Sequence, residues 1–215
     1  MQESVINHVL EKKLIAIVRG QDPDVCLKLG DALYEGGIEM MEITFNQKCT
    51  DHFAATTKAI STLAEHMDSK MLIGAGTVLT TEQVDLAKAA GATYIITPNV
   101  NTKLISYAKD KDLVVMPGAF TPSEIVDAYD AGADFVKVFP AGNLGANYIK
   151  AIKAPLSHIR LLAVGGVNEK NIAEFLKAGV AGAGVGGNLV NKNWIAAGEF
   201  DRITELSKEY VNAVK

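Results

Sequence analysis

The chain has 215 residues, of which 48% are hydrophobic and 21% are charged, and its formal net charge is −4. This composition is typical of a globular protein with a sizeable core, and the slight negative charge argues against a nucleic-acid partner or an anionic membrane surface. Cys26 and Cys49 stand far apart without metal-ligand spacing, so the sequence predicts neither a disulfide framework nor a zinc site. No apolar segment has the length of a signal peptide or of a membrane span, so we expect one cytoplasmic domain over residues 1–215.

A short amphipathic helix over residues 2–12 comes first, and apolar runs separated by amphipathic segments follow it. Because these runs are almost continuously apolar and rich in β-branched residues, they predict parallel strands that are covered by helices. Eight runs of this kind occur, namely Leu14–Val18, Ile38–Phe45, Met71–Ala75, Thr93–Thr97, Leu113–Met116, Asp134–Phe139, Arg160–Val164 and Ala181–Val185.

The segments between the predicted strands carry helix signals at both ends. Thr121–Glu124 combines an N-cap, a proline at the first helical position and the glutamate of a capping box, and Thr80 with Gln83 repeats the box. Glycines such as Gly91 and Gly132 follow helices and precede strands, as a left-handed C-cap requires. Eight strand–helix units predict an α/β fold, a (β/α)₈ TIM barrel with a short N-terminal helix, and the alternative is an open doubly wound sheet.

Lys137 interrupts the apolar run Asp134–Phe139 near its C-terminal end. An ammonium group at this position must be desolvated, which lowers its pKa and produces an amine nucleophile able to form a Schiff base. The C-terminal ends of the strands build the active sites of (β/α)₈ barrels, so Lys137 is a candidate catalytic residue. The alternatives are a lysine that snorkels from an edge strand and a structural ion pair.

Glu42 occupies a similar place in the second predicted strand, where a period of two puts Met40, Glu42 and Thr44 on one face. The second and sixth strands can face each other across the lumen of a barrel, which would bring Glu42 and Lys137 together. A Schiff-base enzyme needs this pair, because the lysine attacks a ketone and the carboxylate moves protons during dehydration and C–C cleavage. The alternative is a structural Lys–Glu ion pair in the barrel core.

Two glycine pairs, Gly165-Gly166 and Gly186-Gly187, follow the last two predicted strands, and each is expected to lead into a helix. Backbone N–H groups on such loops bind anions, and barrels commonly hold phosphate at these two loops. The two pairs therefore predict a phosphate site, and tight turns are the alternative.

Two further strand ends complete the predicted rim of the barrel. Gly74-Ala75-Gly76-Thr77 ends the third strand with small residues and a hydroxyl group that suit a carboxylate, and Arg19 ends the first strand with a guanidinium group. Alternatively, Thr77 is a helix cap and Arg19 a surface charge. The four histidines have no ligand spacing and predict no metal site; they are His8, His52, His66 and His158.

Taken in order, these motifs resemble those of the 2-keto-3-deoxy-6-phosphogluconate (KDPG) aldolases, which also act on 4-hydroxy-2-oxoglutarate. The resemblance covers essentially the whole chain and rests on Ile17–Gly20, Glu42–Thr44, Gly74–Val78, Pro117-Gly118 with Thr121-Pro122, Phe135–Pro140 and Gly165–Val167. It implies a metal-independent class I aldolase without a cofactor, usually a homotrimer, on a (β/α)₈ barrel.

The resemblance also implies roles for individual residues. Lys137 would form the Schiff base, Glu42 would be the acid/base, and the remaining site residues would bind substrate. Thr77 and Gly76 would hold the pyruvate carboxylate, Pro98 and Phe139 would line the pocket, Gly166, Val167, Gly186 and Gly187 would hold the phosphate, and Arg19 offers a further anion contact.

The implied reaction is cleavage of KDPG to pyruvate and glyceraldehyde 3-phosphate, with 4-hydroxy-2-oxoglutarate as a further substrate. Two positions depart from the family pattern, because many members have an arginine where Asn46 stands and a serine where Gly187 stands. Other functions are an aldolase for the galactonate-derived epimer, a phosphosugar isomerase or decarboxylase, a metal-dependent aldolase, and a non-catalytic phosphometabolite-binding protein.

Overall fold

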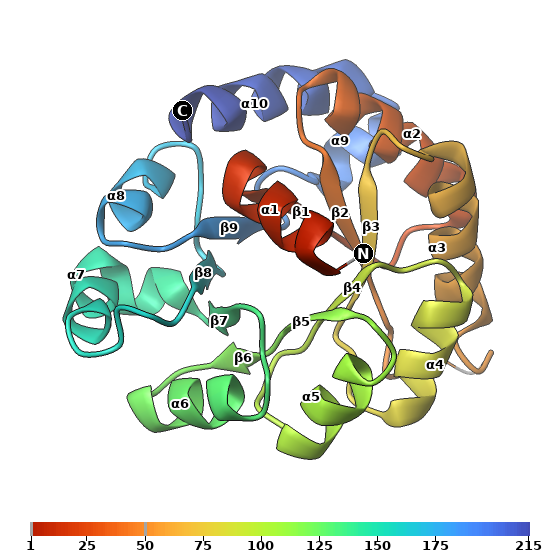
Figure 1. The fold of residues 1–215 in the computed structure, drawn as a ribbon. Helices are drawn as coiled ribbons and strands as arrows, with labels where there is room; N and C mark the ends of the chain where they lie inside the picture. The colour runs from red at the N-terminus through yellow and green to blue at the C-terminus, as the bar shows by residue number, and fades with distance from the viewer. Residues whose placement is uncertain (1, 50) are drawn as a thin grey trace.

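The computed structural model describes residues 2–49 and 51–215, and its strands form one parallel sheet that is rolled into a barrel and surrounded by helices (Figure 1). The strands are β1 (Leu14–Arg19), β2 (Met40–Thr44), β3 (Leu72–Gly76), β4 (Tyr94–Ile96), β5 (Val114–Met116), β6 (Gly118–Ala119), β7 (Val136–Val138), β8 (Leu161–Val164) and β9 (Gly182–Val185). The helices are α1 (Gln2–Lys12), α2 (Pro23–Glu35), α3 (Ala54–His66), α4 (Thr81–Ala89), α5 (Thr102–Lys109), α6 (Pro122–Asp130), α7 (Ala141–Lys153), α8 (Ile172–Lys177), α9 (Lys192–Ala197) and α10 (Phe200–Ala213).

The barrel closes through the segment that contains β5 and β6, which are separated only by Pro117. The strand order is β5-β4-β3-β2-β1-β9-β8-β7-β6, so β5 pairs with β4 while β6 pairs with β7. The carbonyl of Pro117 accepts a hydrogen bond of 2.8 Å from the N–H of Lys137, and the carbonyl of Val115 accepts one of 3.0 Å from Asp134. The predicted fifth strand, Leu113–Met116, therefore ends before Pro117, and the chain then forms β6, a ninth strand that was not predicted. The predicted barrel is confirmed over the open sheet.

Alternation along the strands divides the apolar side chains into two cores. One lies between the strands and the surrounding helices, and the other fills the barrel. The interior core contains Ile15, Met40 and Phe135 together with Val5 and Val9 of α1. Figure 1 shows α1 lying across the barrel, and because β1 begins directly after it, α1 covers the end at which the strands start. The opposite end, where the strands finish, is not covered by α1.

The local signals at helix ends were mostly confirmed. Thr121 and Glu124 form the reciprocal capping box. The box predicted at Thr80 forms only in part, because the Thr80 side chain accepts a hydrogen bond from the N–H of Gln83, whereas the Gln83 side chain accepts one from the N–H of Leu79. Gly91 and Gly132 adopt left-handed conformations after their helices. Among the described residues, no helix combines the length and apolar character that a membrane crossing requires.

Candidate active site

Lys137 lies in the middle of β7, and its side chain belongs to the inner face of the barrel. Phe135 precedes it by two residues and is part of the interior core, so the period of two turns Lys137 inward as well. Only 4% of Lys137 is exposed, and its Nζ lies 4.7 Å from the centre of the Phe139 ring. Burial lowers the pKa of the Lys137 ammonium, and the positive charge of Arg19 lowers it further while Glu42 opposes the shift.

Glu42 lies on β2, which stands opposite β7 in the barrel. Three strands, β1, β9 and β8, separate β2 from β7 on one side of the strand order. Glu42 is 1% exposed, and burial raises the pKa of its carboxyl although the charges of Lys137 and Arg19 oppose this effect. The two buried groups therefore face one lumen from opposite walls, as the sequence predicted.

The electrostatics of this pair differ from those of a structural ion pair. Among the described residues, no hydrogen bond or ion pair joins Lys137 to Glu42, and Oε2 of Glu42 is buried without a hydrogen-bond partner. Burial pushes the amine and the carboxyl toward their neutral forms. A neutral amine is a nucleophile and a neutral carboxyl is a proton donor, so the site offers both groups that addition to a ketone needs.

The predicted phosphate loops meet around a cavity of about 220 Å³ at the C-terminal end of the barrel. Gly165 and Gly166 adopt left-handed conformations with φ values of 86° and 77°. The cavity is lined by Ile17, Arg19, Phe139, Val164, Gly165, Gly166, Val167, Gly184, Gly186, Gly187 and Asn188. Since Phe139 also covers the amine of Lys137, this cavity adjoins the reactive pair.

A second cavity of about 440 Å³ lies on the other side of Arg19. Its lining includes the cations Arg19, Lys48 and Lys192 and contains no carboxylate. It also includes Thr77, which the family resemblance assigns to the pyruvate carboxylate, and Asn46, where many members have an arginine. The exposed Arg19 guanidinium therefore stands between two cavities, which is a more specific place than that of an ordinary surface charge.

Thr77 has an unusual backbone conformation that its neighbours hold in place. Its φ is 55°, which is uncommon for a β-branched residue and costs about 1–3 kcal/mol. Its carbonyl accepts a hydrogen bond of 2.8 Å from Nε2 of Gln47, and Oε1 of Gln47 accepts one of 3.0 Å from the fully buried Gln83. Gln83 also accepts a 2.6 Å hydrogen bond from the N–H of Leu79. The helix cap is Thr80, so the alternative role of Thr77 as the cap of α4 is wrong.

One expectation about the loops is wrong. Helices do not begin directly after the glycine pairs, because α8 starts at Ile172 and α9 at Lys192. Asn168 and Asn171 form a local turn instead, in which each side-chain carbonyl accepts a hydrogen bond from the other residue's N–H. Pro98 is half-buried beside Gly118 and lines neither of the two cavities.

Three residues near the site gave no functional signal in the sequence analysis. They are Tyr94, Gln47 and Gln83, and each depends on partners from another strand or loop. Gly76 also has a more definite place than its small size suggested. A Cβ atom added there would lie 2.7 Å from Cδ of Glu42 and closer still to Oε1, so the carboxyl occupies the space above this glycine.

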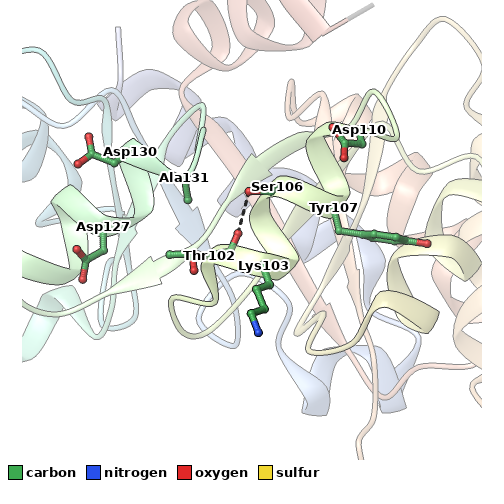
Figure 2. A pocket seen from close by; sticks show the side chains of 8 residues that line it. All are labelled: Thr102, Lys103, Ser106, Tyr107, Asp110, Asp127, Asp130 and Ala131. Carbon is green, nitrogen blue, oxygen red and sulfur yellow. Dashed lines mark hydrogen bonds between the residues drawn. The ribbon is translucent and has the colours of Figure 1, made fainter.

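A hollow on the outer surface lies between α5 and α6 and has a volume of about 670 Å³ (Figure 2). Its charged residues are exposed, and the hydrogen bond drawn in Figure 2 joins Ser106 to the carbonyl of Thr102 within α5. It therefore lacks the desolvated amine and carboxyl of the barrel. Its lining consists of Thr102, Lys103, Ser106, Tyr107, Asp110, Asp127, Asp130 and Ala131.

No group of three or more histidine, cysteine, aspartate or glutamate side chains is placed to hold a metal ion within residues 2–49 and 51–215. Two of the four histidines lie beside a single carboxylate each: Nε2 of His8 is 3.4 Å from Oε2 of Glu39, and Nε2 of His66 is 2.8 Å from Oδ1 of Asp31.

Comparison with known proteins gives the same family as the residues do. Residues 5–206 match the family model described as KDPG and KHG aldolase. The 2-dehydro-3-deoxy-6-phosphogalactonate aldolase of Escherichia coli (strain K12) is 37% identical over 203 residues, covering 94% of each chain. A 2-dehydro-3-deoxy-phosphogluconate aldolase of Haemophilus influenzae is 32% identical over 214 residues, covering 99% of this chain and 98% of its own.

A solved structure shows the same arrangement of the chain. The KDPG aldolase of Legionella pneumophila, in which pyruvate was captured at low pH as a covalent carbinolamine intermediate, superimposes with a TM-score of 0.84 and 28% identity. The match covers 97% of both chains.

Proposed function

We propose that this chain, which belongs to the KDPG and KHG aldolase family and is thus a carbon–carbon lyase, works through a Schiff base on Lys137. The observation that supports this proposal is a lysine that is 96% buried at the lumen of the barrel, facing a buried glutamate without an ion pair. Stability alone does not favour such an arrangement, because well-packed apolar residues would cost less.

The neutral amine of Lys137 attacks the C2 carbonyl of a 2-keto acid and forms a carbinolamine. Protonation of its hydroxyl group by Glu42 releases water and leaves an iminium ion, which attracts electrons from the adjoining carbon. Glu42, now ionised, takes the proton of the C4 hydroxyl group through a water molecule. The C3–C4 bond then breaks, the aldehyde leaves, and its bonding electrons form an enamine. Protonation of the enamine at C3 and hydrolysis of the imine release pyruvate and restore Lys137.

Two cavities at the C-terminal end of the barrel support a substrate class for this reaction. The glycine-lined cavity of about 220 Å³ would bind the terminal phosphate through backbone N–H groups, and the second cavity would draw the carboxylate through its cations. A 6-phosphorylated 2-keto-3-deoxy sugar acid carries both anionic groups. Its cleavage gives pyruvate and glyceraldehyde 3-phosphate.

We infer that both C4 epimers, the gluconate-derived and the galactonate-derived acid, are substrates. The E. coli relative is named for the galactonate form and the H. influenzae relative for the gluconate form. Asn46 and Gly187 also give a looser grip at the two ends of the substrate than arginine and serine would. Binding energy at remote groups positions the reacting carbon, so a looser grip lowers the discrimination between epimers.

Borohydride reduction in the presence of pyruvate tests the mechanism. A stable adduct should add to the protein and map to Lys137, and Lys137→Ala should give neither adduct nor turnover. Glu42→Gln should lose about 10²–10⁴-fold in kcat while slow trapping continues. Folded protein that gives no adduct would exclude the Schiff-base mechanism and favour an isomerase, a decarboxylase without an imine, or a binding protein.

Substrate choice is tested separately by comparing kcat/KM for the two phosphorylated epimers and for 4-hydroxy-2-oxoglutarate. We expect both epimers to be cleaved and the unphosphorylated acid to react more slowly. Equal values with and without phosphate would show that the glycine loops are turns. The family resemblance also supports a homotrimer, for which sedimentation equilibrium should give three chains per particle.

A further inference from the structure

Glu42, Gly74 and Tyr94 form a row across three neighbouring strands on the inner face of the barrel. Glu42 of β2 is the register partner of Gly74 of β3, and Gly74 is the register partner of Tyr94 of β4. A Cβ atom added to Gly74 would overlap Cδ2, Cε2 and Cζ of the Tyr94 ring. The ring therefore lies over the glycine and points along the row toward Glu42.

The two ends of this row carry unpaired polar atoms. The hydroxyl oxygen of Tyr94 and Oε2 of Glu42 are both buried, and neither has a hydrogen-bond partner among the described residues. Tyr94 is 0% exposed. A buried polar group without a partner costs about 1–3 kcal/mol, so two such groups in one row on the inner face of the barrel need an explanation. A phenol is a donor and a carboxylate is an acceptor, which makes the two atoms chemically complementary.

The position of the carboxyl indicates what the phenol would do. Oε1 of Glu42 occupies the space above Gly76, one row nearer the end of the barrel where the cavities lie. Of the two carboxyl oxygens of Glu42, Oε2 is therefore the one available to the hydroxyl group of Tyr94. A hydrogen bond at Oε2 would fix the carboxyl plane and leave Oε1 toward the substrate.

We propose that Tyr94 is a positioning residue whose hydroxyl group donates a hydrogen bond to Oε2 of ionised Glu42 during the reaction. This inference rests on the proposed function, because it assigns Tyr94 to the group that carries the protons. Tyr94 has no contact with substrate and acts only through Glu42.

The charges around Glu42 support this assignment. Lys137 of β7 and Arg19 of β1 both favour the ionised carboxylate, and Tyr94 of β4 is the further titratable group that faces it. Burial and the charge of Glu42 raise the pKa of Tyr94 well above 10, so the phenol keeps its proton and remains a donor at any working pH. Donation to the charged form lowers the pKa of a carboxyl, which keeps Glu42 available as a base.

The test is Tyr94→Phe, which retains the ring over Gly74 and removes only the hydroxyl group. Loss of the hydrogen bond to the charged carboxylate should raise the pKa of Glu42, so the acid limb of the pH profile of kcat should shift to higher pH by about one unit. The matched control is Tyr107→Phe, at a tyrosine on the outer surface that is labelled in Figure 2. This variant removes a hydroxyl group that donates a hydrogen bond of 2.8 Å to Asp85. This control should leave the profile unchanged. An unmoved acid limb in Tyr94→Phe would overturn the proposal.

A double-mutant cycle separates a positioning role from a loss of packing. In the Glu42→Gln background no carboxylate remains, so Tyr94→Phe should change kcat by less than about twofold, although it changes kcat in the parent protein. Equal losses in both backgrounds would show that Tyr94 does not act through Glu42. Borohydride trapping of pyruvate on Tyr94→Phe should remain near the parental level. Loss of trapping in the parent protein would instead defeat the proposed function itself.

Discussion

Gly76→Ala would displace the carboxyl of Glu42 without removing a single polar group. The added Cβ atom would lie 2.7 Å from Cδ of Glu42 and 2.9 Å from Cγ2 of Thr44, whereas an ordinary contact is 3.4–4 Å. Because Gly76 has no positive φ, an alanine suits its strand backbone, and the substitution acts through the contact alone. Relief of the clash moves the carboxyl by about 1 Å, and a misplacement of this size can cost about 10²-fold in rate.

We therefore expect Gly76→Ala to lower kcat about 100-fold in a coupled assay of pyruvate release, with the Schiff-base lysine still able to react. Borohydride trapping of pyruvate should then stay within a few-fold of the parent. Gly30→Ala is the matched control, because its new Cβ atom also makes contacts of 3.0 Å, but with the flexible ends of Leu63 and Met67 on the outer side of the barrel. Its kcat should be that of the parent.

Stability and kcat are measured on the same Gly76→Ala protein. A thermal melt should show that Gly76→Ala is folded, since overpacking a core typically costs about 1–3 kcal/mol and leaves the fold intact. A folded Gly76→Ala protein with parental kcat would refute the claim that the position of the Glu42 carboxyl controls the reaction.

Three other changes have distinct expected results. Lys137→Met should abolish turnover and raise the free energy of unfolding by about 1–3 kcal/mol, since it replaces a desolvated amine with an apolar side chain of similar length. Burial lowers the pKa of Lys137 in the folded state, so the free-energy cost of burying this lysine grows as the pH falls below the unfolded value of 10.5. The increase in the free energy of unfolding caused by Lys137→Met should therefore be larger at about pH 7 than at about pH 10. An equal increase at both pH values would show that the amine is not desolvated. Gln83→Leu removes the support of Thr77 and should raise KM about tenfold with little change in kcat in steady-state assays; an unchanged KM would show that Thr77 is held without Gln83. Gly166 has a φ of 77°, and a Cβ atom added there would lie 3.0 Å from Cα of Gly142, so Gly166→Ala strains this loop. The variant's kcat/KM should fall for the phosphorylated epimers and stay constant for 4-hydroxy-2-oxoglutarate. Equal losses for all three substrates would show that the phosphate binds elsewhere.

The barrel could be predicted from the sequence because its signals are local. Strands covered on both sides are apolar throughout, and the helices between them carry caps such as Thr121 with Glu124. Lys137 and Glu42 were visible for the same reason, as charges at inner positions of otherwise apolar runs. The period of two is enough to place each on the lumen once the barrel is assumed.

What could not be predicted depends on neighbours that are distant in the sequence. Gln47 and Gln83 are 36 residues apart, and their hydrogen bond has no periodic pattern to reveal it. Tyr94 resembles any aromatic residue in a buried strand, because the fate of its hydroxyl group depends on the absence of a side chain at Gly74. The helix predicted directly after Gly165-Gly166 begins later for another reason, since the turn of Asn168 and Asn171 competes with helix formation through side-chain hydrogen bonds.

The stability costs of this fold gather at the end of the barrel where the strands finish. A buried amine, a buried carboxyl with an unpaired oxygen and a β-branched residue with positive φ all lie there, while the opposite end is closed by α1 and packed with apolar side chains. Each of these features disfavours the folded state, so a sequence selected for stability alone would have replaced them. Desolvation is also what moves Lys137 and Glu42 toward a nucleophile and an acid. Desolvation therefore causes both the stability cost of burying Lys137 and Glu42 and the reactivity of these two groups. Substitutions at these positions that increase the free energy of unfolding should also remove the activity.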